Sequence, residues 1–420
     1  MKGIMPMKKL LCIFLALTMV LSLVGCGKQI DDNPPPVSDD NPGVSDTDTP
    51  TEDETPDQPI ENQWNYDFDG AFIEENGLEY IWAQLDEQTR IALGEVMNAI
   101  KNVEIYCSLS RGIPTEGSEE FLKLVSFCSM AYTYESNVFR RHTDENGKVI
   151  GITLNYNVNY EEEAHTRTQE LDSAINEIIS GMPNGSDYDK IKYLHDALIL
   201  KCDYSENAVS PFTAYGALVE GRATCQGYAD AMHLLLSRAG YETCFATGIG
   251  ESEAVTHKWN YVLVGDDWYI IDPTWNDPEG EEDKSYINYD YLFISEEVLL
   301  TDHKETFDSP YYDVPLADSM ELNYHIVNGY YAEDYEQLKE IVKGQVEACV
   351  ANGTKYIYVR CANQEVFDLA NSKLFSGDCE MQKILIEVKD ATDANIRTNS
   401  WVKVTDEGPK TLTITLKYED

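Results

Sequence analysis

Basic residues are scarce in this sequence. Its 420 residues include 31 lysines and arginines against 75 aspartates and glutamates, which gives a formal net charge of −44 at pH 7. A surface of that charge repels the phosphate backbone, so we exclude nucleic acid as a partner. A solvated acidic face is the simplest explanation of the charge, although it also favours basic peptides as ligands.

Motifs for metals and phosphates are missing as well. There is no Cys-x-x-Cys and no His-Glu-x-x-His, and the segment from Gly221 to Gly227 lacks the lysine of a phosphate-binding loop. Five further histidines show no metal-ligand spacing: His142, His165, His233, His303 and His325. We therefore predict no metal site and no cofactor.

The apolar run near the start of the chain is too short to cross a bilayer comfortably, which takes ~20 residues. It extends from Leu10 to Val24 after two lysines, a pattern typical of a secretory signal. An uncleaved membrane anchor is the alternative. Because the run ends in Leu-Val-Gly-Cys26, it resembles the bacterial lipoprotein signal. We predict a signal peptide over 1–25, a lipid on Cys26, and a protein anchored on the extracellular face of the bacterial cell membrane.

Cysteine usage argues against a disulfide framework. Apart from Cys12 and Cys26, most cysteines sit within apolar runs, as buried cysteines do. If Cys225 stays a free thiol, an odd number remains, which cannot all pair internally. We predict mainly reduced core residues among the remaining seven: Cys107, Cys128, Cys202, Cys244, Cys349, Cys361 and Cys379.

Composition and hydrophobic periodicity divide the chain. Residues 31–59 hold ten acidic residues, seven prolines and no basic residue, so this stretch cannot bury enough apolar surface to fold. We predict a disordered tether over 26–62, followed by three folded domains. These are an N-terminal α+β domain over 63–185, a catalytic domain over 186–315 and a C-terminal α+β accessory domain over 316–420.

Cys225 is predicted to open a helix. Gly221 breaks the chain, Thr224 is a candidate cap, and apolar residues then repeat at helical spacing until Gly240. In the first helical turn, free N–H groups and the positive end of the helix dipole stabilise a thiolate. The same N–H groups can hold a developing oxyanion. A lone cysteine in such a place is more often a packed small residue, so its partners decide the interpretation.

His257 and Asp272 are predicted to be neighbours on one face of a hairpin. Two alternating strands flank the two-residue turn Gly265-Asp266, so Val264 faces Asp267. In that register Asp272 is the diagonal neighbour of His257, ~7–8 Å away along the backbone and within side-chain reach. A carboxylate there orients the imidazole, while the other ring nitrogen serves the cysteine.

Together these motifs resemble the transglutaminase-like superfamily over 187–278, roughly a quarter of the chain. The matching residues are Tyr215-Gly216-Ala217-Leu218, Gly221-x-x-x-Cys225-Gln226-Gly227-Tyr228-Ala229, His257-x-Trp259-Asn260 and Trp268-Tyr269-x-x-Asp272-Pro273-Thr274-Trp275. The resemblance implies an α+β, papain-like core in which the cysteine helix packs on an antiparallel sheet. It also implies Cys225 as nucleophile, His257 as acid and base, and Asp272 as the orienting residue.

The resemblance does not fix the reaction, because the superfamily includes cross-linkers, amidases, peptidases and inactive members. We predict a cysteine enzyme that acts on amide bonds of a protein or peptide, cell-wall peptides included, through a thioester. Water and an amine both remain open as acyl acceptors. The alternative is a non-catalytic surface module that binds wall or protein ligands. The presence of all three catalytic residue types argues against it.

Overall fold

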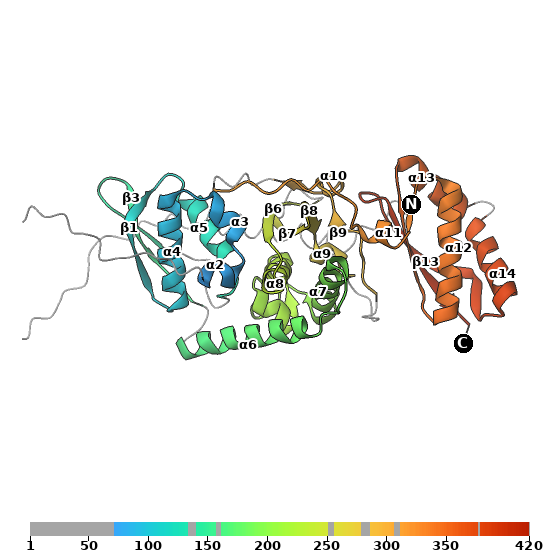
Figure 1. Ribbon diagram of the computed structural model, residues 1–420, viewed down its shortest axis with the longest axis horizontal. Coiled ribbons are helices and arrows are strands. Elements are labelled where there is room, and N and C mark those ends of the chain that lie inside the picture. The colour runs from blue at the N-terminus through green and yellow to red at the C-terminus, as the bar shows by residue number, and fades with distance from the viewer. Residues whose placement is uncertain are drawn as a thin grey trace, which may run out of the picture.

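The computed structural model describes residues 71–132, 140–156, 161–250, 256–278, 286–305, 311–376 and 379–419 (Figure 1). The predicted signal peptide, Cys26 and the acidic tether lie outside these ranges. Helices and mainly antiparallel sheets occur together throughout the described part, so the fold is α+β, as predicted. Within these ranges, no helix has both the length and the apolar character needed to cross a membrane.

The leading part combines short helices with a three-stranded antiparallel sheet of order β1-β3-β2. Its elements are α2 (Ala71–Asn76), α3 (Glu79–Gln84), α4 (Glu87–Lys101), β1 (Tyr106–Pro114), α5 (Ser118–Cys128), β2 (Arg140–Thr143), β3 (Lys148–Thr153) and α6 (Glu161–Ser180). The sequence predicts one helix over 78–101. The structure divides it because Asp86 caps a new helix, accepting a hydrogen bond from Thr89 N at 2.9 Å.

The central part holds a five-stranded antiparallel sheet of order β10-β6-β7-β8-β9. Helix α8 packs against β6 and β7, so the predicted cysteine helix on an antiparallel sheet is present. The elements are α7 (Asp187–Lys201), β4 (Asp203–Tyr204), the π-helical turn η1 (Gly216–Glu220), β5 (Arg222–Ala223), α8 (Cys225–Arg238), β6 (Thr243–Ile249), β7 (Thr256–Val264), β8 (Asp267–Ile271), α9 (Pro273–Asn276), β9 (Leu292–Ile294), α10 (Glu296–Leu299) and β10 (Lys304–Glu305).

The C-terminal part is a four-stranded sheet of order β11-β12-β14-β13 packed with helices, at one end of the molecule in Figure 1. Its elements are α11 (Tyr324–Val327), β11 (Tyr331–Ala332), α12 (Tyr335–Asn352), β12 (Tyr356–Cys361), α13 (Gln364–Leu369), η2 (Ala370–Leu374), α14 (Glu380–Thr392), β13 (Ile396–Asp406) and β14 (Thr411–Tyr418). The sequence predicts a strand over 322–327, which is wrong. Asn323 accepts a hydrogen bond from His325 N at 3.2 Å and so caps a helical turn.

Buried apolar side chains form two clusters. One extends from Phe72 to Tyr324 and includes both the leading helices and the five-stranded sheet. The other extends from Ala332 to Leu416. Polar contacts connect the two, and in one of them Thr411 Oγ1 donates to Asp290 Oδ2 at 2.6 Å. The C-terminal part therefore has its own core and still contacts the central part through buried groups.

Candidate active site

Cys225 is the first residue of α8, as the sequence predicts. Gly221 ends the preceding turn with φ of +73°, a conformation that glycine adopts at no steric cost, and Thr224 is extended. The prediction that Thr224 caps the helix with its side chain is wrong, because its hydroxyl donates to Pro211 O at 3.0 Å. The N–H groups of the first turn therefore have no side-chain cap from Thr224.

Gly227 is buried against the chain itself. A Cβ at this position would lie 2.8 Å from Thr213 O and 3.0 Å from Pro211 O. The glycine thus lets the 211–213 loop approach α8 closely. A glycine beside a catalytic cysteine also suits the approach of a substrate backbone, but here the 211–213 loop occupies that position.

His257 and Asp272 lie on neighbouring strands in the predicted register. Val264 faces Asp267 and Asn260 faces Ile271, so Asp272 follows directly at the end of β8. His257 Nε2 donates to Asp272 Oδ2 at 2.6 Å. The chain then turns into α9, where Asp272 Oδ1 accepts hydrogen bonds from Thr274 N and Trp275 N. This turn prevents the pairing of His257 with Thr274 that an extended strand would give.

The structure brings Cys225, His257 and Asp272 together. The Cys225 side chain interacts with His257 and helps to raise its pKa, and the Cys225 sulfur lies 3.9 Å from the carbonyl oxygen of Thr256, the residue before His257. His257 and Asp272 are buried, whereas Cys225 is partly exposed. Because Nε2 of His257 is bound to Asp272, Nδ1 is the ring nitrogen that is left to interact with the sulfur.

The electrostatics of the pair favour a charged histidine. Burial opposes protonation of His257, but the Asp272 carboxylate and the Cys225 side chain outweigh it and raise the pKa of His257 to about 9. Burial also opposes ionisation of Asp272, yet His257 and His303 hold the pKa of this carboxyl well below its usual value. At pH 7 the pair is therefore an imidazolium bound to a carboxylate.

His303 belongs to the same group, although sequence spacing does not reveal it. Its Nε2 donates to Asp272 Oδ2 at 3.3 Å. Ligand atoms of His257, Asp272 and His303 lie within 4.8 Å of one another, a nitrogen and oxygen donor set of a type that suits Zn²⁺. Both Nε2 atoms, however, are already directed at Asp272 Oδ2 in hydrogen bonds, and these bonds account for the arrangement without an ion.

Aromatic side chains enclose the His257 ring. The ring centroids of Trp259 and Trp275 lie 6.0 and 5.9 Å from that of His257. Trp259 is fully buried and Trp275 is partly exposed. His195 on α7 is a buried structural residue whose ring nitrogens lie 3.0 Å from Asp196 Oδ1 and 3.0 Å from Asn276 Nδ2.

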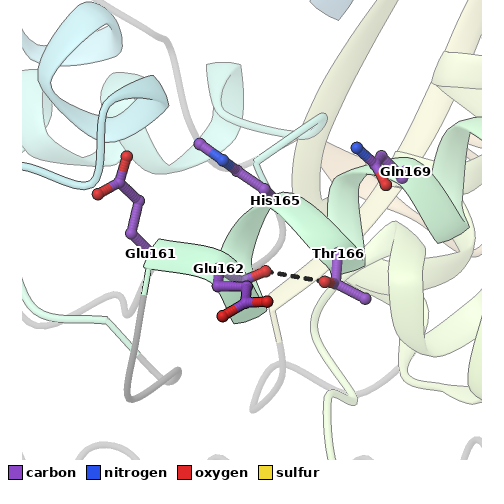
Figure 2. Close-up of a pocket in the computed structure, with 5 residues that line it drawn as sticks. All are labelled: Glu161, Glu162, His165, Thr166 and Gln169. Atoms are coloured by element: carbon purple, nitrogen blue, oxygen red, sulfur yellow. Dashed lines mark hydrogen bonds between the residues drawn. The ribbon is translucent and has the colours of Figure 1, made fainter.

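A pocket of about 440 Å³ lies away from these residues (Figure 2). Its lining belongs to one face of α6: Glu161, Glu162, His165, Thr166 and Gln169. Neither Cys225 nor His257 takes part in it. The pocket thus has no share in the chemistry of the candidate active site.

Most of the other described cysteines are more deeply buried than Cys225. None of the eight cysteines that the structure describes forms a disulfide, and six of them are buried: Cys107, Cys128, Cys202, Cys244, Cys349 and Cys361. Burial raises the pKa of Cys107, Cys128 and Cys361 to about 12, so these remain thiols at neutral pH. Cys225 and Cys379 are the two partly exposed ones.

Comparison with known proteins agrees with the motifs. Residues 173–273 match the model of the Transglutaminase-like superfamily, and this match confirms the resemblance. The matched segment contains Cys225, His257 and Asp272, and members of the superfamily are usually cysteine enzymes.

Two solved structures are similar to parts of the chain. One is a TGase, 13% identical with a TM-score of 0.25, for which 35% of this chain and 46% of that chain are covered. The other is the "Putative Cysteine Protease" from Cytophaga hutchinsonii, 13% identical with a TM-score of 0.22, for which 33% and 61% are covered. The chain thus spans less than two thirds of either. No curated protein matches it.

Proposed function

We propose that the protein is a cysteine enzyme that acts on amide bonds through a thioester. Cys225 is the nucleophile, His257 the acid and base, and Asp272 the residue that orients the imidazole. The observation that carries this proposal is the convergence of the three side chains, with His257 Nε2 bound to Asp272 Oδ2 at 2.6 Å and the Cys225 side chain close enough to act on the imidazole.

The first half of the reaction forms the acyl-enzyme. The Cys225 thiolate, paired with the His257 imidazolium, attacks the carbonyl carbon of a glutamine side chain or a peptide, and a carbon–sulfur bond forms. His257 then gives its proton to the departing ammonia or amine as the carbon–nitrogen bond breaks. The pKa of about 9 suits this role, because the ring is protonated at neutral pH.

The second half resolves the thioester. Neutral His257 takes a proton from water or from a lysine amine while the water oxygen or the amine nitrogen attacks the carbonyl carbon of the thioester. The carbon–sulfur bond breaks, the thiolate returns, and the imidazolium forms again. Water as acceptor gives hydrolysis or deamidation, whereas an amine gives a cross-link.

The start of α8 supports oxyanion stabilisation. The Thr224 hydroxyl is directed at Pro211 O, so the first-turn N–H groups retain their capacity to donate. They lie beside the sulfur that attacks, which is where negative charge develops on the carbonyl oxygen.

The test is incubation of the protein with a glutamine- and lysine-containing peptide library and a labelled primary amine, followed by mass spectrometry. Amine incorporation with loss of ammonia identifies a transferase, deamidation an amidase, and backbone cleavage a peptidase. Cys225→Ala is the control, and it should abolish all three products without a change in thermal unfolding. Products that persist in this variant, or that never form with the native protein, contradict the proposal and favour the binding module.

We further propose that the enzyme is held at the extracellular face of the membrane by a lipid on Cys26. The lipoprotein-like end of the apolar run and the acidic, proline-rich stretch that follows support this location. Growth with a clickable fatty acid should label the protein, and Cys26→Ala should abolish the label. An unlabelled native protein would contradict the anchor.

A further inference from the structure

Asp272 serves two histidines, of which the proposed mechanism uses only one. Oδ2 accepts a hydrogen bond from His257 Nε2 at 2.6 Å and a second one from His303 Nε2 at 3.3 Å. Both rings are buried, and their centroids are 5.4 Å apart. His303 therefore approaches the carboxylate from a second direction and limits its rotation.

His303 is itself fixed on its other side. Its Nδ1 donates to Asp302 Oδ1 at 2.7 Å, and Tyr291 OH donates to Asp302 Oδ2 at 2.5 Å. Trp275 packs on the ring with centroids 4.0 Å apart. Both ring nitrogens act as donors because each of them faces a carboxylate oxygen, and Asp272 and Asp302 accordingly raise the pKa of His303 against the effect of burial. The ring is thus held by hydrogen bonds at both ends.

The turn between β13 and β14, in the C-terminal part, packs closely against Asp302. A Cβ at Gly408 would overlap the Asp302 carboxylate and lie 3.0 Å from Thr301 Oγ1. The carboxylate is buried and bound to Tyr291, so it has little freedom to move aside. Tyr291 OH also lies 3.4 Å from Asp406 Oδ2, at the start of the same turn.

We propose that His303 is a positioning residue, which holds Asp272 in the orientation that directs His257 at Cys225, and that the 406–410 turn keeps His303 in place. This inference rests on the proposed function, because it assigns His303 a part in the same chemistry. His303 contacts neither the sulfur nor, by its burial, a substrate. Its effect is therefore transmitted through Asp272.

The test compares His303→Leu with His303→Gln. Leucine cannot donate to Asp272, whereas the glutamine amide can. The readout is the alkylation rate of Cys225 by iodoacetamide at pH 7, measured by peptide mapping with Cys379 of the same molecule as the reference. We expect His303→Leu to slow Cys225 alkylation roughly 10-fold or more, a size typical of a misplaced reacting group, and His303→Gln to recover most of the rate.

A merely structural histidine gives another result. In that case the leucine variant would lower thermal stability while the folded fraction reacts at the native rate, or glutamine would fail to rescue it, and the proposal would be overturned. Turnover of the native protein is scored separately. If Cys225 alkylation depends on His303 but the native protein turns over no amide, the proposed function is contradicted and the positioning role of His303 stands.

Gly408→Ala tests the contribution of the turn. The added methyl group must displace Asp302, so we expect slower Cys225 alkylation, although residue 408 is far along the chain from every catalytic residue. Gly344→Ala in α12 is the matched control, since no atom lies within 4 Å of a Cβ there. Equal alkylation rates in the two variants, both folded by circular dichroism, would remove the turn from the proposal.

Discussion

Lys258 Nζ donates a hydrogen bond to Asp230 Oδ1 over 2.5 Å, and both side chains are almost completely buried. Lys258 follows His257 on β7, and Asp230 lies on α8, the helix that begins at Cys225. The Phe245 ring covers the ammonium, with its centroid 4.0 Å from Nζ. The ion pair thus joins the strand that carries the histidine to the helix that carries the cysteine.

Removing one member of this pair should be costly. Lys258→Met leaves the Asp230 carboxylate buried and unpaired, so we expect a loss of about 3–5 kcal/mol in the free energy of unfolding, measured by urea denaturation. Adding Asp230→Leu should recover most of the loss. Lys190→Met, which breaks the more exposed pair with Asp187, is the control and should cost no more than about 1 kcal/mol. Equal costs for the two lysines would contradict the prediction.

The acid role of His257 should end near pH 9. Its pKa is raised from 6.5 to about 9, so the ring stays protonated through neutral pH and loses its proton above this value. We expect kcat/KM to fall as the pH rises through about 9. By the same linkage, the contribution of His257 to stability is complete below pH 6.5 and is lost as the pH rises through about 9. A rate that keeps rising beyond pH 10 would exclude His257 as the proton donor.

Asp272→Asn should move the alkaline fall of kcat/KM toward lower pH. The substitution removes the carboxylate charge that raises the pKa of His257, while an amide oxygen can still cap α9 in place of Oδ1. We expect kcat to fall by up to about 10⁴-fold, the cost of a histidine in the wrong tautomer. The measurement is a pH–rate profile of both proteins, together with NMR titration of the His257 ring. An unmoved His257 titration in the variant would refute this account of its pKa.

Gly227→Ala should destabilise the start of α8. The methyl group meets Thr213 O and Pro211 O, which are backbone atoms and can move only with their loop. Overpacking of this kind costs about 1–3 kcal/mol, which differential scanning calorimetry detects as a lower Tm. If Gly227 instead met the substrate, KM would rise at unchanged Tm, and that outcome would reverse our assignment.

Alkylation should discriminate between the cysteines of the native protein. Cys128 is fully buried, and burial raises its pKa to about 12, so the thiol is both inaccessible and protonated. We expect iodoacetamide to modify Cys225 within the folded protein and to reach Cys128 only after unfolding in urea. Peptide mapping before and after unfolding checks this. Early modification of Cys128 would show that the core around it opens readily.

Much of the site could be predicted because its information is local. The two-residue turn at Gly265-Asp266 fixes the register of β7 and β8, and this register alone makes His257 and Asp272 diagonal neighbours. The sequence also predicts a helix over 161–180, because its helical periodicity ends at Gly181, and α6 has these bounds. Local patterns of this kind need no knowledge of the rest of the fold.

The parts that were missed depend on distant segments. His303 reaches Asp272 because β10, which begins at Lys304, pairs with the far end of β6 opposite Ile249. No spacing in the sequence encodes that pairing. The short helix α11 was predicted as a strand because its apolar residues fit either structure, and the Asn323 cap decides between them. Substrate and acceptor were left open for the same reason, because both depend on the walls of the site.

Contacts from the C-terminal part to Asp290 and Asp302 in the central part have a consequence for the design of truncated proteins. A recombinant fragment that ends at residue 315 would lack Thr411, which donates a hydrogen bond to the buried Asp290. It would also lack Gly408, which packs against Asp302. Water would then enter behind the histidines. We expect such a fragment to be inactive because it lacks the C-terminal residues that pack behind Asp302 and His303. Its inactivity would therefore say nothing about the chemistry of the intact chain.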